Sequence, residues 1–208
     1  MKLLLCSWGP WRNALLEKTF LDLLTKPTNH NTVNILSINT TSDFFKKHLN
    51  IAKTWLTKIG FQQTNIQVYN LKSNNIPSFE NLDILLMFGG NNYHYLQQIR
   101  QKNLVTRIRE FIDSDGIYVG SSAGSNIMAP DLDENLSNDV NDISLEDLKG
   151  FRYIDFHLLV HWNTTEGEAR TSQIQYAWKT GKRVIPLTDQ QAILVQNDGF
   201  KIISPDVI

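Results

Sequence analysis

The feature that most constrains this chain is an alternation of short apolar runs with longer segments of helical spacing. The apolar runs indicate strands and lie at residues 2–7, 32–38, 65–71, 83–89, 116–120, 156–161 and 183–187. The segments between them indicate amphipathic helices and cover residues 12–25, 42–59, 92–113 and 166–180. Several runs are apolar almost throughout, which is typical of strands covered on both faces. The alternation therefore predicts an α/β protein with a mainly parallel sheet between layers of helices.

The C-terminal part departs from this alternation. Two short apolar runs in "AILVQNDGFKII" flank Asn197-Asp198-Gly199, a sequence typical of a hairpin turn. The length of 208 residues suits one compact domain with a sizeable core, and no internal repeat, linker or low-complexity tract divides it. We therefore expect a single domain over residues 1–208.

Composition argues against several classes of function. The formal net charge is −1 and no basic cluster is present, so nothing indicates nucleic-acid binding. The opening "MKLLLCSWGPW" holds an apolar run too short for a signal-peptide core or a membrane span. The only cysteine, Cys6, rules out an internal disulfide and a multi-cysteine metal site. We expect a cytoplasmic protein, a monomer or homodimer, without nucleic-acid or membrane partners.

An acidic segment at residues 130–150 interrupts the alternation. The spacing of Asp131, Asp133 and Asn135 is that of the start of a calcium-binding loop. Leu136, however, stands where such a loop needs glycine, and Asp142 stands where it needs a bidentate glutamate. The segment is therefore expected to be a solvated, mobile loop near the functional site.

The stretch "GIYVGSSAGS" at residues 116–125 ends a strand in small and hydroxyl side chains. Its Gly120-Ser121-Ser122-Ala123-Gly124 fits the nucleophile-elbow pattern G-x-S-x-G. In that turn the central serine is lifted above the carboxyl edge of the sheet, and its neighbours must be small. Ser122 is therefore a candidate nucleophile, although a purely structural strand-to-helix turn would give the same letters.

A second glycine turn follows the expected strand at 83–89, in "LLMFGGNNYHYL". Paired glycines let the backbone approach a ligand and turn its N–H groups inward. Gly89-Gly90 could form one wall of an oxyanion hole, or they could belong to an ordinary loop before the next helix.

Two further candidates follow expected strands. His161 ends "FHLLVH", on the sheet edge where Ser122 is expected to emerge, while His157 lies deeper and suits the core. Asp189, in "PLTDQQAILV", could orient and charge-stabilise a histidine. On local grounds alone, an ordinary turn residue remains an equal interpretation of this aspartate.

Taken together, these pieces resemble the peptidase E family of aspartyl dipeptidases, which is related to the cyanophycinases. The resemblance covers nearly the whole chain and is strongest in "FGGNNYHYL", "GIYVGSSAGSNIMAP" and "GEARTSQI". It implies a serine peptidase on a flavodoxin-like three-layer sandwich, like that of the class I glutamine amidotransferases. It implies no metal or organic cofactor and a small peptide as the partner.

The resemblance also implies roles for individual residues. Ser122 corresponds to the nucleophile, His161 to the base and Asp189 to the third member of the triad, while Gly90 and Ala123 correspond to the oxyanion amides. Two more residues are candidates for substrate binding. These are Arg170 in the shared "GEAR" stretch and Asn91 in the glycine loop.

The sequence differs from the dipeptidase pattern at several places. Phe88 replaces the first glycine of a Gly-Gly-Gly-Asn loop, the context of His161 is changed, and the loop from His161 to Gly167 is shorter. Asp189 replaces a glutamate. The sequence therefore leaves two substrate classes: peptides with an N-terminal acidic residue, and substrates with another acyl or isopeptide bond. A non-catalytic binding or regulatory protein, which keeps the elbow only as a turn, is the alternative from another class.

Overall fold

The main element of the fold is a seven-stranded sheet in the order β3-β2-β4-β5-β1-β8-β9. The computed structural model describes residues 1–38, 42–162, 167–197 and 199–205, with only the backbone of 167–169. Five neighbouring strands of the sheet are parallel: β1 (Lys2–Cys6), β2 (Val33–Ser37), β3 (Ile66–Asn70), β4 (Ile84–Met87) and β5 (Ile117–Ser121). An antiparallel hairpin, β8 (Ala192–Gln196) and β9 (Gly199–Ile203), completes the sheet beside β1. The mainly parallel sheet and the C-terminal hairpin are as the sequence predicts.

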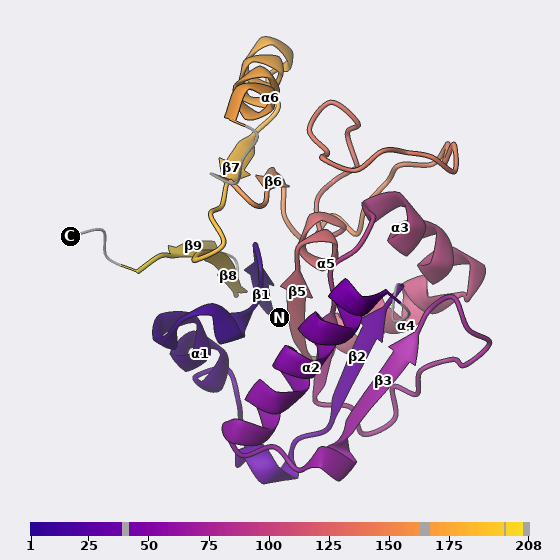
Figure 1. Cartoon of the computed structure of the whole chain (residues 1–208), viewed down its shortest axis with the longest axis vertical. Helices are drawn as coiled ribbons and strands as arrows, with labels where there is room; N and C mark the ends of the chain where they lie inside the picture. The colour runs from indigo at the N-terminus through magenta and orange to yellow at the C-terminus, as the bar shows by residue number, and fades with distance from the viewer. Residues whose placement is uncertain (39–41, 163–166, 198, 206–208) are drawn as a thin grey trace.

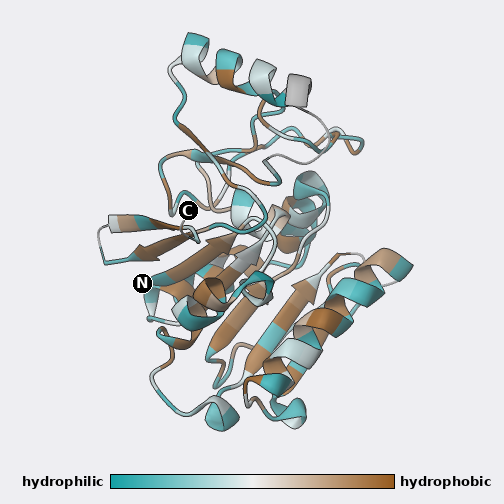
Figure 2. Cartoon of the chain, turned by 60° about the vertical axis from the view of Figure 1, so that its left-hand side comes forward, coloured by the Kyte–Doolittle hydropathy of each residue, from teal (hydrophilic) through white to brown (hydrophobic). Residues whose placement is uncertain are grey.

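Helices cover both faces of this sheet (Figure 1). One face carries α1 (Ala14–Leu21) and α2 (Asp43–Lys58). The other face carries α3 (Asn92–Gln101), α4 (Leu104–Asp113) and the short α5 (Ala123–Asn126). Alternate residues of the strands point into two separate cores, so that Leu4 of β1 packs with the first group and Leu3 with the second. Figure 2 shows the resulting apolar sheet between helices of mixed polarity, which is the predicted three-layer α/β arrangement.

The helices differ from the sequence prediction in one place. The segment 92–113 forms two helices, because Asn103 adopts a left-handed conformation with φ 55° and ends the first. Short 3-10 helices occupy Pro10–Arg12, Thr28–His30 and Gln63–Asn65. No helix in the described part of the chain is long and apolar enough to cross a membrane.

The expected strands at 156–161 and 183–187 do form, but neither lies in the main sheet, so their expected placement is wrong. They are the short β6 (His157–Leu159) and β7 (Val184–Pro186), which pair in parallel as a separate two-stranded sheet. The hairpin β8–β9 already occupies the place beside β1, so β6 has no position there. The helix α6 (Gly167–Thr180) connects β6 to β7, and Figure 1 shows this unit above the carboxyl edge of the parallel strands.

The acidic segment 130–150 is less solvated than the sequence suggests. Leu132 and Leu136 are buried, and the carboxylate of Asp139 accepts a hydrogen bond from the backbone N of Asn92. Asp133 pairs with Lys182 at 2.7 Å instead of facing other carboxylates. Among the described residues, no group of three or more histidine, cysteine or acidic side chains could hold a metal ion. The segment fastens the β6–β7 unit to the start of α3.

Candidate active site

Ser122 stands at the junction of β5 and α5 with φ 52° and ψ −113°. A positive φ strains a residue that carries a side chain, so the surrounding fold has to hold it there. The positions two residues before and after it need glycine. A Cβ on Gly124 would lie 2.2 Å from the Met87 carbonyl oxygen, and one on Gly120 would lie 2.8 Å from the Gly124 carbonyl oxygen. Although Ser122 is the N-cap of α5, its hydroxyl makes no capping hydrogen bond. That hydroxyl is directed to another partner.

The partner is His161, which in turn contacts Asp189. The distance from Ser122 Oγ to His161 Nε2 is 2.8 Å, and the distance from His161 Nδ1 to Asp189 Oδ1 is 2.7 Å. Because a carboxylate only accepts hydrogen bonds, Nδ1 carries a proton, and in the neutral ring Nε2 accepts from the Ser122 hydroxyl. A base in this position can take the serine proton. The catalytic roles of the three residues remain predictions.

His161 and Asp189 both come from the small sheet. His161 lies two residues beyond β6, and its φ of 59° turns it towards Ser122. The ring of Trp8 packs edge-on against the His161 ring, with centroids 5.5 Å apart and planes at 80°. Asp189 lies three residues beyond β7. The base and the acid therefore belong to one structural unit, in which His161 follows β6 and Asp189 follows its pairing partner β7.

A residue that the sequence did not single out joins them. Ser7 follows β1 and is fully buried. Its hydroxyl donates to Asp189 Oδ1 at 3.1 Å and accepts from the backbone N of His161 at 2.7 Å. The sequence signal that could have identified Ser7 is its position directly after a buried strand, at the edge where parallel strands end together.

The Asp189 carboxyl is held in its charged form. Burial is the largest single influence and acts to raise its pKa, while the hydrogen bond and the charge of His161 act to lower it. The Ser7 hydroxyl and the Arg12 guanidinium act in the same direction, so the pKa lies below its ordinary value. An ionised Asp189 can stabilise an imidazolium on His161.

The glycine loop after β4 lies next to the nucleophile. A Cβ on Gly89 would lie 3.4 Å from Ser122 Cβ, and Gly90 has φ 145°. A Cβ on Gly90 would lie 2.8 Å from the Ile38 side chain, so glycine is needed there on steric grounds as well. The Gly90 amide and that of Ala123, which directly follows Ser122 in the chain, are the two candidates for binding an oxyanion.

Comparison with known proteins identifies the family. The model of Peptidase family S51 matches residues 3–203. This chain belongs to peptidase family S51, a family of serine peptidases. The resemblance to peptidase E that its motifs indicate is thereby confirmed at the level of the family.

Curated relatives of this S51 chain are distant. It is 28% identical over 108 residues to Peptidase E of Escherichia coli, covering 48% of this chain and 45% of that protein. An uncharacterized peptidase of Pasteurella multocida is 27% identical over 118 residues, which cover 56% of this chain and 57% of that protein. The chain thus spans about half the length of these relatives. With an uncharacterized peptidase of Listeria innocua, the identity is 22% over 196 residues, 90% of this chain and 94% of that protein.

Solved structures agree with the S51 chain in fold. A crystal structure of a candidate peptidase E protein from Listeria monocytogenes superimposes with a TM-score of 0.80 at 19% identity, covering 99% of this chain and 98% of that chain. A peptidase from an acI-B1 actinobacterium gives a TM-score of 0.66 at 12% identity, covering 98% and 87%. Both likenesses concern the fold alone.

The two residues predicted to bind substrate in this S51 chain have other contacts. Arg170 is 4% exposed, and its Nη2 donates to the carbonyl oxygen of His161 at 3.4 Å. Its alternative partner Glu166 lies outside the described residues. Asn91 caps α3 by accepting from the backbone N of Tyr93 and donates through Nδ2 to the Val140 carbonyl oxygen. Their substrate-binding roles stay predictions, and the described contacts are structural ones.

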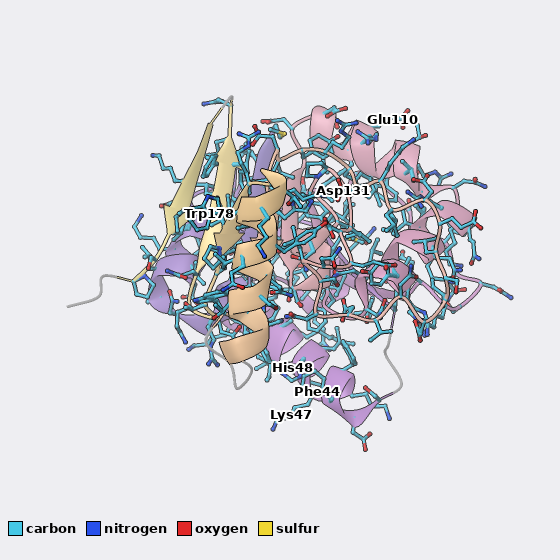
Figure 3. All side chains as sticks on the ribbon, turned by 90° about the horizontal axis from the view of Figure 1, so that it is seen from above. Phe44, Lys47, His48, Glu110, Asp131 and Trp178 are labelled. Carbon is cyan, nitrogen blue, oxygen red and sulfur yellow. The ribbon has the colours of Figure 1, made fainter. Side chains whose placement is uncertain are left out.

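Sequence reasoning also missed the walls of the pocket beside Ser122 in this S51 chain. One part of its lining consists of Gly89, Gly90, Ser121, Ser122 and His161. The other part consists of Trp8, Trp11, Phe44, Phe45, His48 and Phe88. Figure 3 looks down on the carboxyl edge and shows Phe44 and His48 on α2. Aromatic residues at the start of α2 gave no sequence signal for a site, because nothing local places that helix end beside residue 122.

Proposed function

We propose that this S51 chain hydrolyses peptide bonds of small peptides through an acyl-enzyme formed on Ser122. The observation that carries the proposal is the line of hydrogen bonds from Ser122 Oγ through His161 to Asp189, at 2.8 and 2.7 Å. The strained backbone of Ser122 and its missing capping bond support it, because both are expected of a nucleophile elbow. The proposal treats the chain as one peptidase domain that needs no metal or organic cofactor.

In the first step Ser122 Oγ bonds to the peptide carbonyl carbon while His161 Nε2 takes the hydroxyl proton. The intermediate then collapses, the carbon–nitrogen bond breaks, and the same proton passes from Nε2 to the leaving amine. Water repeats the sequence on the acyl-enzyme. His161 takes a proton from the water while the water oxygen bonds to the acyl carbon. The bond from that carbon to Ser122 Oγ then breaks, and His161 returns the proton to Ser122 Oγ as the carboxylic acid leaves.

Two neighbouring groups stabilise the charges that these steps create. The amides of Gly90 and Ala123 are proposed to donate to the oxyanion, each contributing roughly 10²–10³ in rate if it resembles known donors. Asp189 keeps Nδ1 protonated and stabilises the imidazolium that forms when His161 has taken the serine proton.

The resemblance to peptidase E suggests peptides with an N-terminal acidic residue as substrates. Such a residue needs a cation near the scissile bond, and Arg170 is the candidate that the sequence offers. If Arg170 binds the substrate carboxylate, Arg170→Ala weakens cleavage of acidic dipeptides far more than that of neutral ones. An equal loss on both kinds of substrate would assign Arg170 to support of the His161 backbone.

The test of the reaction is labelling by a fluorophosphonate, with the labelled peptide located by mass spectrometry. Wild type is expected to be labelled at Ser122, and Ser122→Ala and His161→Ala are expected to resist labelling. Ser114→Ala is the control, because that hydroxyl bonds to the Phe111 carbonyl oxygen at the end of α4. Failure of wild type to react, with the fold intact, would favour the non-catalytic alternative.

A further inference from the structure

The pocket beside Ser122 has aromatic walls that come from separate parts of the chain. Trp8 and Trp11 follow β1, Phe44 and His48 lie in the first turns of α2, and Phe88 follows β4. The pocket reaches Ser122 and His161 themselves, so whatever occupies it also contacts the proposed nucleophile and base.

Ring contacts make these walls continuous. The Trp8 ring lies 4.9 Å from the His48 ring, and the His48 ring lies 4.1 Å from the Phe44 ring, between centroids. On the other wall, Trp11 stacks on Phe88 at 5.8 Å with planes at 17°. Phe88 stands where the dipeptidase pattern has glycine, so this wall is one of the departures seen in the sequence.

Phe44 shows that the pocket is not a closed core. Its side chain is 59% exposed, although it belongs to the same ring cluster as His48. A large apolar side chain that enters the pocket would cover this ring and remove apolar surface from water, which favours binding.

The charges around the pocket disfavour an acidic occupant. None of the described residues that line it is a lysine or arginine. Arg12 lies over the Trp8 ring, 5.9 Å from its centroid, and its charge acts on Asp189. A carboxylate among the aromatic walls would lose its hydration and would meet only the histidines His48 and His161 as possible cations, which is unfavourable.

We propose that this pocket selects substrates with a large apolar side chain, aromatic or branched aliphatic, next to the scissile bond. The inference rests on the proposed peptidase function and names its substrate class. It competes with the acidic specificity that the resemblance to peptidase E suggests, and the following test decides between the two.

The test uses two sets of dipeptides, in which the residue before or after the bond is Ala, Leu, Phe or Asp. For wild type, kcat/KM is expected to be about 100-fold higher with Leu or Phe than with Asp at one of the two positions. Phe44→Ala should reduce cleavage of the Leu and Phe substrates about tenfold more than cleavage of the Ala substrate. Phe44→Lys places a cation at the rim and should shift the preference towards Asp.

Ile51→Ala is the matched control, because Ile51 is an exposed apolar residue of α2 at 40% exposure and lies outside this pocket. It should leave the preference unchanged. A preference of wild type for Asp at either position, or an equal loss on all substrates in Phe44→Ala, would overturn the inference.

Two further measurements separate this inference from the proposed reaction. Fluorophosphonate labelling of Ser122 reports the nucleophile without any peptide side chain in the pocket. Calorimetric binding of the same dipeptides to Ser122→Ala reports the pocket without turnover. Labelling together with Asp-selective binding would overturn only the pocket inference. Selective binding of Phe dipeptides that is lost in Phe44→Ala, without labelling of wild type, would overturn only the reaction.

Discussion

The nucleophile and the base of this site are held by different kinds of structure. Ser122 directly follows β5, a central strand between β4 and β1, and contacts with the backbone of the main sheet fix its turn. His161 and Asp189 stand on the β6–β7 unit, which shares no strand pairing with the main sheet in the described part of the chain. They are joined to the main sheet by polar contacts such as those of Ser7 and by apolar packing of Leu158, Val160 and Leu187 in the shared core.

This difference separates two ways of building a reactive centre. The strain at Ser122 is maintained by close packing that tolerates no added atom, so it should depend on the stability of the sheet. The β6–β7 unit also packs in the core, but the orientation of His161 depends on a few hydrogen bonds, so it should respond to single side-chain changes that leave the fold intact. Each of the following predictions tests one side of this contrast.

The largest effect is expected on the base side, from Asp189→Asn. An asparagine favours the wrong tautomer of His161, so kcat should fall by about 10⁴-fold, as at comparable triads. The thermal unfolding midpoint should stay close to that of wild type. Steady-state kinetics and a melting curve on the same preparation make the comparison. Near-normal turnover would give the role to another acid, of which Asp139 in the acidic segment is the first to test.

On the nucleophile side, Gly124→Ala should reduce the free energy of unfolding by about 3 kcal/mol, because the added Cβ meets a backbone oxygen that cannot easily move. Urea unfolding measures the change. Gly199→Ala is the control, since a Cβ there meets nothing within 4 Å, and its effect should stay within about 0.5 kcal/mol. Equal stability of the two variants would show that the elbow is not held by packing.

Ser7→Ala should lower kcat about 10- to 100-fold with KM unchanged, because His161 and Asp189 lose their common anchor. Ser125→Ala is the matched variant. Ser125 is equally buried and bonds the Cys6 carbonyl oxygen, and no described contact joins it to His161 or Asp189. Both variants should lose similar stability, but only Ser7→Ala should lose turnover, and Ser7→Thr should restore part of it. A parallel loss of turnover in both would contradict a positioning role.

The smallest expected effect is the pH dependence of stability. The pKa of Asp189 is lower in the folded chain than its ordinary value, so its charge stabilises the fold above the unfolded pKa, about 3.9. This contribution is lost as the pH falls through the folded pKa. Between pH 5 and about pH 2, wild type should therefore lose more stability than Asp189→Asn. Parallel curves in chemical denaturation would mean that the ion pair with His161 adds nothing to folding.

The sequence predicts what local backbone requirements determine. Alternating runs identified all five parallel strands and the hairpin, and the glycines around Ser122 identified its turn. The position of His161 was predicted at the correct edge but for a wrong reason, because β6 was placed in the main sheet. The strand β8 occupies the position beside β1 that β6 would need. The periodicity of a single strand does not show which of two strands takes such a position.

The parts that could not be predicted depend on how distant elements meet. Ser7 and Phe44 contact the site through the placement of β1 and α2 relative to the small sheet, not through a motif. The acidic segment was taken for a solvated loop because its composition hides Leu132 and Leu136, whose burial depends on α6 and β6 above it. Pairwise tertiary contacts of this kind leave no periodic trace in one sequence.

The separate attachment of the β6–β7 unit implies that activity and folding can end at different temperatures. Leu158, Val160 and Leu187 anchor this unit in the core, but a segment outside the strand pairing of a central sheet can still open locally at lower free energy than that sheet does. Heating would then separate His161 from Ser122 while the seven-stranded sheet stays folded, so the protein would lose activity at a lower temperature than that at which it unfolds. The half-life of activity on heating would then depend on the contacts that hold the β6–β7 unit to the main sheet. A cross-link between the two would prolong activity without raising the melting temperature.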